Sequence, residues 1–231
     1  MLPEYDEFKR RADAVRMRIS AACAASHRDP GGVELLAVTK MFPAAAAEYA
    51  ARYGLRAVGE NRVQEGVEKQ AQTTAHVAWE LIGHLQSNKA RLAAGHFSRI
   101  QSADSAKLLA ALDRVASELG KTQPVLLQVN SGLDPAKSGV EPGEAGRLLE
   151  AALALRHIRV DGLMAIAPLS DDPSVARRAF ASLREIRDRL TRESGAALPE
   201  LSMGMSGDME AAIGEGSTIV RVGSALFGAR A

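Results

Sequence analysis

The sequence has little cysteine, few aromatic residues and almost no net charge. Cys23 is the only cysteine in 231 residues, which excludes an internal disulfide and a metal site built from cysteines. Lys and Arg number 29 and Asp and Glu 28, for a net charge of +1. A chain with so little net positive charge is not expected to attract the phosphate backbone of nucleic acid. We therefore predict no nucleic-acid partner and no metal.

Long apolar runs are also missing. No stretch approaches the roughly 20 apolar residues that a membrane helix needs. The segment Met1–Arg18 is charged throughout and is unlike a secretory signal. We expect a soluble cytoplasmic protein with no membrane partner. The hydrophobic fraction of 46% is ample for a core, and the length suits one domain over residues 1–231.

Short apolar runs alternate with helical patterns along the chain. A long helix is predicted from about Pro3 to Ser26, before the first run. Further helices are predicted over Lys107–Leu119, which has a single apolar stripe, and from Asp172-Pro173 to about Ser194. Eight runs are predicted strands: Glu34–Lys40, Arg56–Glu60, Trp79–His84, Arg99–Ser102, Val125–Asn130, Val160–Ala167, Glu200–Met205 and Thr218–Gly223.

Eight strands, each followed by a helix or a helical turn, indicate an α/β fold, the (β/α)8 TIM barrel with an extra amino-terminal helix. An open doubly wound sheet is the alternative. Polar residues recur at the predicted carboxyl ends of the strands, and a closed barrel would bring these ends to one mouth, whereas an open sheet would spread them along an edge. We therefore favour the barrel. The residues concerned are Lys40, Glu60-Asn61, His84, Ser102, Asn130, Met164 to Pro168, Ser206 and Ser224.

Lys40 ends the apolar run that begins at Leu35. Strand interiors exclude unpaired ammonium groups, so a lysine there would lie where a buried strand opens into a loop. Partial burial lowers the pKa of an amine, and a neutral amine condenses with an aldehyde to a Schiff base. A solvated lysine just beyond the strand is the other interpretation of this residue alone.

Two segments near the carboxyl terminus predict a phosphate site. Ser206-Gly207 follows the seventh predicted strand, and Gly223-Ser224 follows the eighth. Barrels often bind phosphate with these two loops, through backbone N–H groups at the start of a short helix. Glycine lets the backbone approach an oxyanion, and serine supplies a hydroxyl donor. Each segment by itself is also compatible with an ordinary turn.

Arg221 lies within the last apolar run. Alternation places it on the same face as Ile219, opposite Val220 and Val222. An arginine that points into a barrel needs an acceptor. Either a structural carboxylate or the ring nitrogen of a cofactor would serve.

Further segments complete a pattern that resembles a known family. They are Gly59-Glu60-Asn61-Arg62-Val63-Gln64-Glu65, Trp79 to Lys89 and Gly162 to Pro168, together with Val38-Thr39-Lys40, Lys137-Ser138-Gly139 and Ser202 to Ser206. In this order they resemble the pyridoxal 5'-phosphate homeostasis protein family, whose barrel is similar to the amino-terminal domain of bacterial alanine racemase. The resemblance covers about Leu35 to Gly228.

The resemblance implies pyridoxal 5'-phosphate as cofactor and assigns expected roles. Lys40 matches the Schiff-base lysine, Asn61 a polar residue near the ring oxygen, and Arg221 the arginine facing the pyridine nitrogen. Ser206, Gly223 and Ser224 match the residues that bind the phosphate of the cofactor. Met164 and His84 match residues that pack against the cofactor ring or lie one layer further from it. Lys137 matches a family lysine and is equally compatible with a solvated loop.

The chain departs from the racemases. Alanine racemase has a carboxyl-terminal domain that supplies a catalytic tyrosine, whereas this sequence ends eight residues after Gly223. Its three tyrosines lie in amino-terminal helical stretches, and no second base is evident. We expect a monomeric, non-enzymatic protein that holds the cofactor, with cofactor-dependent apoenzymes as candidate recipients. A racemase with an unrecognised base and a barrel for another phosphorylated metabolite are the alternatives.

Overall fold

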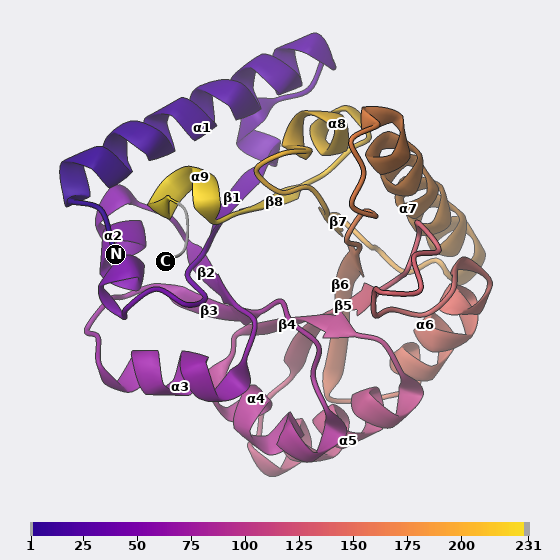
Figure 1. Cartoon of the computed structure of the whole chain (residues 1–231). Coiled ribbons are helices and arrows are strands. Elements are labelled where there is room, and N and C mark those ends of the chain that lie inside the picture. The colour runs from indigo at the N-terminus through magenta and orange to yellow at the C-terminus, as the bar shows by residue number, and fades with distance from the viewer. Residues whose placement is uncertain (1, 229–231) are drawn as a thin grey trace.

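The computed structural model describes residues 2–228 and contains a closed barrel of eight parallel strands. Each strand pairs with the next along the chain, and β1 pairs with β8 to close the ring (Figure 1). This arrangement confirms the predicted (β/α)8 barrel and excludes the open sheet. The strands are β1 (Glu34–Val38), β2 (Ala57–Glu60), β3 (Ala78–Leu81), β4 (Arg99–Ala103), β5 (Gln123–Gln128), β6 (Ile158–Met164), β7 (Glu200–Ser202) and β8 (Ile219–Val222).

Every strand is followed by a helix on the outside of the barrel. The helices are α1 (Tyr5–Ala25), α2 (Ala45–Tyr53), α3 (Val63–Ala71), α4 (Ala90–His96), α5 (Ala106–Glu118), α6 (Ala145–Leu153), α7 (Pro173–Ser194), α8 (Met209–Gly214) and α9 (Ser224–Phe227). Short 3-10 turns cover Pro30–Gly32, Ser87–Lys89 and Pro142–Glu144. No helix within residues 2–228 is long and apolar enough to cross a membrane.

The predicted helix signals act as expected at α7. The side chain of Asp172 accepts a hydrogen bond from the Ser174 backbone N–H at 2.9 Å, and Pro173 occupies the first turn. The helix ends at Ser194, and Gly195 follows it with a φ of 71°, in the left-handed region that glycine adopts without strain.

Two apolar layers stabilise the barrel, one inside the ring and one between the strands and the helices. Alternation along β8 separates them, because Ile219 points inward while Val220 and Val222 join the outer layer. The inner layer is small and consists of Leu36, Val38, Ala57, Ile82, Leu126, Met164 and Ile219, with Ile166 packed against it.

The amino-terminal helix α1 crosses α8 and α9, the helices after the last two strands (Figure 1). Phe8 stacks on Phe227 with ring centroids 5.2 Å apart. Arg28 donates to the Ile213 carbonyl at 2.6 Å. The extra helix therefore supports the part of the barrel in which the phosphate site was predicted.

Several predicted strands extend too far. β1 ends at Val38, β6 at Met164 and β7 at Ser202. Apolar residues continue beyond β6 and β7, whereas Thr39 and Lys40 follow β1. The residues that follow leave the sheet to form loops at the mouth, and Ala165, Ala167 and Met203 are buried there. Burial under these loops, not strand pairing, explains the additional apolar residues.

Candidate functional site

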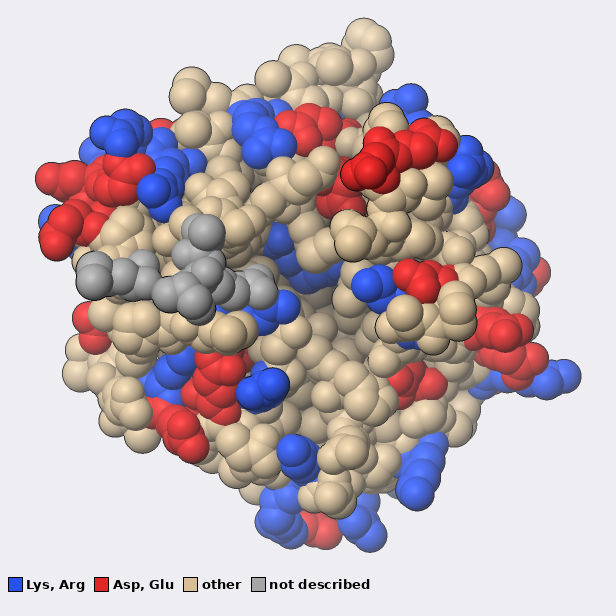
Figure 2. Space-filling model, in the orientation of Figure 1, with Lys and Arg blue, Asp and Glu red and all other residues tan. Residues whose placement is uncertain are grey.

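A cavity of about 270 Å³ lies where the strands end. The space-filling view shows a hollow near the centre of the face, with Lys or Arg atoms at its floor (Figure 2). Six of the seven predicted cofactor-binding residues line the cavity: Lys40, Asn61, Ser206, Arg221, Gly223 and Ser224. Val38, Ile82, Ile166, Met205 and Gly207 complete its wall.

Lys40 and Asn61 come from adjacent loops. Lys40 is half-buried and follows the end of β1 by two residues, and Asn61 directly follows β2. Gly83, just after β3, packs against the Asn61 backbone so closely that an added Cβ would lie 2.2 Å from the Asn61 carbonyl oxygen. Only glycine leaves room for Asn61 in this position.

The two predicted phosphate loops meet. The Ser224 Oγ donates to the Ser206 Oγ at 3.3 Å, and Ser224 begins the short helix α9. Apart from its two chain neighbours, no residue in the described range lies within 4 Å of the Cβ that Gly207 lacks. A Cβ at Gly223 would lie 3.3 Å from the Val38 carbonyl oxygen. Gly207 thus leaves its backbone accessible, and Gly223 permits close approach of β8 to β1. Both loops present donors to one point, as an anion requires.

Other residues hold the loop that carries Ser206. The Met205 backbone N–H donates to Asp208 at 2.5 Å, and burial raises the pKa of this carboxyl group. Arg18 of α1 donates to the Ser206 carbonyl at 3.0 Å and pairs with Glu210 at 2.7 Å. The roles of Arg18 and Asp208 are not evident from the sequence, because a helical arginine and an acidic turn residue usually face solvent.

Arg221 points into the barrel, as alternation predicted. It is 4% exposed and donates to the Ser202 Oγ at 2.7 Å and to the Ala165 carbonyl at 2.8 Å. Its direct acceptors are therefore neutral protein groups, not the structural carboxylate that was one expectation. Burial lowers its pKa to about 10, against the opposing effect of the Asp208 charge. The side chain thus stays cationic at neutral pH.

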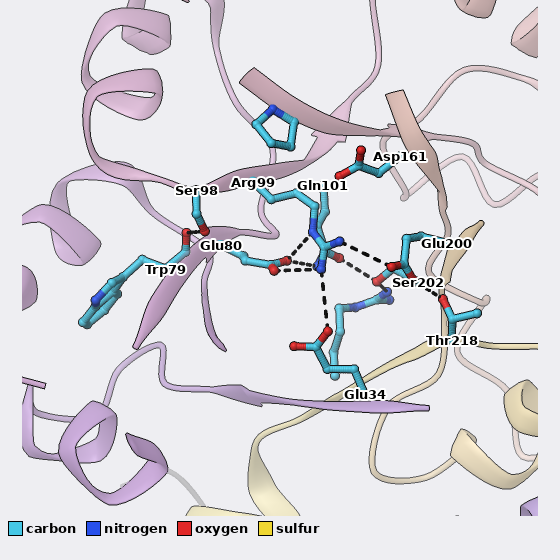
Figure 3. A network of polar contacts seen from close by, with 12 residues as sticks. Glu34, Trp79, Glu80, Ser98, Arg99, Gln101, Asp161, Glu200, Ser202 and Thr218 are labelled. Atoms are coloured by element: carbon cyan, nitrogen blue, oxygen red, sulfur yellow. Dashed lines mark hydrogen bonds and ion pairs between the residues drawn. The ribbon is translucent and has the colours of Figure 1, made fainter. Parts of the chain in front are cut away.

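A chain of polar contacts leads from Arg221 to Ser202 and on into the barrel interior. Figure 3 shows its part from Ser202 to Arg99. Ser202 donates to Gln101 at 2.6 Å, and Gln101 donates to Glu80 at 2.6 Å. Arg99 then pairs with Glu80 at 2.8 Å and lies 3.8 Å from Glu200. Burial acts to lower the pKa of Arg99, but the surrounding carboxylates raise it overall. This network fixes Ser202, and through it the orientation of Arg221.

Three other predicted residues lie elsewhere. Met164 is fully buried in the inner apolar layer and is not part of the cavity wall. His84 contacts Asp104 at 3.1 Å with 53% of its side chain exposed. Lys137 lines a neighbouring pocket of about 550 Å³, which shares Ile166, Met205 and Gly207 with the first.

The cavity combines an amine with donors for an anion. Among residues 2–228, Lys40 and Arg221 are the titratable side chains in its wall. No group of three or more His, Cys, Asp or Glu side chains in that same range could hold a metal ion. This set of residues suits a phosphorylated compound with a carbonyl group, which an amine can attack.

Comparison with known proteins agrees with this geometry. Residues 11–231 match the family model for the alanine racemase N-terminal domain. The chain is 41% identical over 221 residues to the pyridoxal phosphate homeostasis protein of Aquifex aeolicus. The aligned residues cover 95% of this chain and 97% of that protein.

Solved structures extend the comparison. PipY of Synechococcus elongatus, solved with PLP bound, is 40% identical, with a TM-score of 0.85 over 96% of this chain and 100% of that one. An alanine racemase of Clostridium difficile matches with a TM-score of 0.77 at 15% identity, covering 96% of this chain and 56% of the racemase. The racemase likeness concerns the fold alone.

Proposed function

Since this chain belongs to the pyridoxal phosphate homeostasis protein family, whose barrel is that of the alanine racemase N-terminal domain, we propose that it binds pyridoxal 5'-phosphate. The protein would hold the cofactor as a Schiff base on Lys40 and release it to other proteins, without efficient amino-acid turnover. The bound cofactor supplies an electrophilic aldehyde carbon and, in enzymes, an electron sink.

One observation carries this proposal: an amine and two phosphate donors line the same cavity. Lys40 enters from the loop after β1, and Ser206 and Ser224 enter from the loops after β7 and β8. Arg221 would donate to the ring nitrogen and Asn61 to the ring oxygen, while Gly223 lets β8 approach β1 beside the phosphate. Met164 would act from below, as part of the apolar layer under the ring.

The composition of the cavity favours a carrier over an enzyme. A two-base proton transfer needs an acid or base on each face of the substrate carbon. Lys40 could supply one, and Arg221 is a poor base. Tyr53 donates to Asp13 on the outside of the barrel, and burial raises its pKa to about 12. A racemase, and a barrel for a different phosphorylated metabolite, are thus the weaker candidates.

Exposed apolar side chains in the loops at the mouth of the barrel favour transfer to another protein. Of the seven large apolar side chains that are exposed between residues 2 and 228, four lie in loops at the mouth: Met41, Leu133, Leu169 and Met205. Exposed apolar residues gathered around a site are typical of protein contacts. Leu169 is 97% exposed, so its side chain has no packing role in the barrel.

A transfer assay tests the proposed function. Protein loaded with pyridoxal 5'-phosphate should activate an apoenzyme that depends on this cofactor, even with a scavenger of free aldehyde present. Leu169→Ser should slow the transfer and leave cofactor affinity unchanged, whereas Leu153→Ser, on the outer helix α6, should leave both transfer and affinity unchanged. If the scavenger abolishes activation by wild-type protein, transfer proceeds through free cofactor and direct delivery is wrong.

The serine pair gives a quantitative prediction. A hydroxyl that donates to a phosphate oxygen contributes about 1.5–3 kcal/mol, so Ser206→Ala or Ser224→Ala should weaken binding of pyridoxal 5'-phosphate about tenfold to a hundredfold. Pyridoxal, which has no phosphate, should bind both variants as it binds wild-type protein. Spectroscopic titration measures both affinities. Equal losses for the two aldehydes would show that the serines do not contact phosphate.

A further inference from the structure

A second lysine, Lys69, is buried and contacts the loop that carries Lys40. Lys69 of α3 is 6% exposed, and its Nζ contacts three oxygen atoms at 2.7 Å each. These are Oε1 of Glu60, Oε1 of Glu65 and the carbonyl oxygen of Thr39. An ammonium has three protons, so this arrangement uses all of its donors.

The same group of residues holds both neighbours of Lys40. Thr39 is bound twice, because Lys69 contacts its carbonyl and its hydroxyl donates to Glu60 at 2.6 Å. On the other side, the Met41 backbone N–H donates to Glu65 at 2.5 Å. The backbone of both neighbours of Lys40 is therefore hydrogen-bonded to the same group of side chains, Lys69 and Glu65.

The backbone of this turn needs such support. Met41 has a φ of 63°, in the left-handed region that non-glycine residues rarely adopt. Its side chain is 66% exposed, so packing does not hold it in place. The hydrogen bond to Glu65 is thus a main restraint on this conformation. A strained residue beside a functional side chain persists only where its surroundings fix it.

The energetics of the network also indicate a role beyond stability. Burial raises the pKa of Glu60, and Oε2 of this carboxylate is buried with no hydrogen-bond partner among residues 2–228. An apolar replacement of a buried ion pair is often at least as stable as the pair itself. Stability alone therefore gives little reason to place two carboxylates and a lysine here, whereas a precise backbone geometry does.

We propose that Lys69, with Glu60 and Glu65, is a positioning device for Lys40: it fixes the Thr39–Met41 turn so that the Lys40 side chain enters the cavity. This inference rests on the proposed function for its purpose but not for its structural content. The network contacts the main chain on either side of Lys40, so its loss should alter where the amine points and leave the phosphate loops intact.

The test compares two cations that pair with carboxylates. Lys69→Met removes the cation at the centre of the positioning network, and Arg99→Met removes a cation paired with Glu80, away from the cavity wall. Without Lys69, the Glu65 carboxylate loses the ammonium that holds it at the Met41 N–H. Hydrogen exchange in the cofactor-free proteins should therefore show the Met41 amide exchanging about tenfold to a hundredfold faster in Lys69→Met, the factor expected when its charge-assisted hydrogen bond to Glu65 is lost. Arg99→Met should leave it unchanged.

Ligand affinities supply the second measurement. Lys69→Met should bind pyridoxal 5'-phosphate about tenfold or more weakly, while pyridoxine 5'-phosphate, which has no aldehyde, should bind as tightly as to wild-type protein. The double variant Lys69→Met with Glu60→Gln removes the uncompensated buried charge and should show the same selective loss. It serves in place of the single variant if that protein does not fold.

The outcomes separate the two proposals. Equal losses for both ligands, or unchanged exchange at Met41, would overturn the positioning role. If wild-type protein binds both ligands equally and forms no Schiff base, the proposed role of Lys40 is wrong, while faster Met41 exchange in Lys69→Met would still establish that the network holds the turn.

Discussion

Lys40→Ala protein should lose the visible absorbance of the Schiff base completely and keep its fold. The reason is chemical, because Lys40 supplies the amine that lines the cavity beside the predicted phosphate donors. The fold should survive, since Lys40 lies in a loop after β1 and is only half-buried. Visible spectra of the purified proteins with added pyridoxal 5'-phosphate, before and after borohydride reduction, measure the loss directly.

Lys137→Ala is the matched control. Lys137 lines the neighbouring pocket and not the cavity, so this variant should give the wild-type spectrum. Weak residual binding by Lys40→Ala agrees with the assignment, because the phosphate contacts do not depend on the amine. An unchanged visible spectrum in Lys40→Ala would rule out Lys40 as the Schiff-base lysine.

The sequence was sufficient to predict the barrel and most of the cavity because both depend on local patterns. Alternation at Ile219 and Arg221 correctly placed the arginine inside the ring. Polar residues after each strand converge once the sheet closes, so Lys40, Asn61, Ser206 and Ser224 meet without any long-range information beyond the topology.

The supporting contacts could not be predicted in the same way. Lys69 falls in an ordinary amphipathic helix, where a lysine usually faces water, and its burial depends on how α3 packs beside β2. Arg18 contacts a loop 188 residues away. The Arg221 acceptors, Ser202 and Ala165, are set by the register of β6, β7 and β8. These pairings join distant parts of the chain, and no local pattern indicates them.

The interior network explains why Arg221 keeps one orientation. Its two hydrogen bonds go to neutral groups, and Ser202 is fixed in turn by Gln101 and Glu80. A carboxylate at this position would keep a facing pyridine nitrogen protonated and strengthen the ring as an electron sink. A cationic arginine does the reverse, because it donates a hydrogen bond to an unprotonated nitrogen.

We therefore predict that bound cofactor does not make this protein an efficient amino-acid enzyme. Exchange of the α-proton of alanine or serine in heavy water should be at least roughly 10²–10⁴-fold slower than a typical enzymatic turnover of about 10 s⁻¹. The expected reasons are a weak electron sink and a cavity wall that, within residues 2–228, has Lys40 and Arg221 as its titratable side chains. Deuterium incorporation, followed by mass spectrometry at full cofactor occupancy, detects proton abstraction even when racemisation does not occur.

Lys40→Ala with added cofactor gives the background rate of free pyridoxal 5'-phosphate, and wild-type protein should stay close to it. Arg221→Lys should do the same, because it would keep a cation facing the ring nitrogen, whereas Arg221→Gln should raise the rate modestly by removing that charge. Rapid exchange in wild-type protein that disappears in Lys40→Ala would mean that Lys40 acts as a catalytic base, and the protein would then be an enzyme.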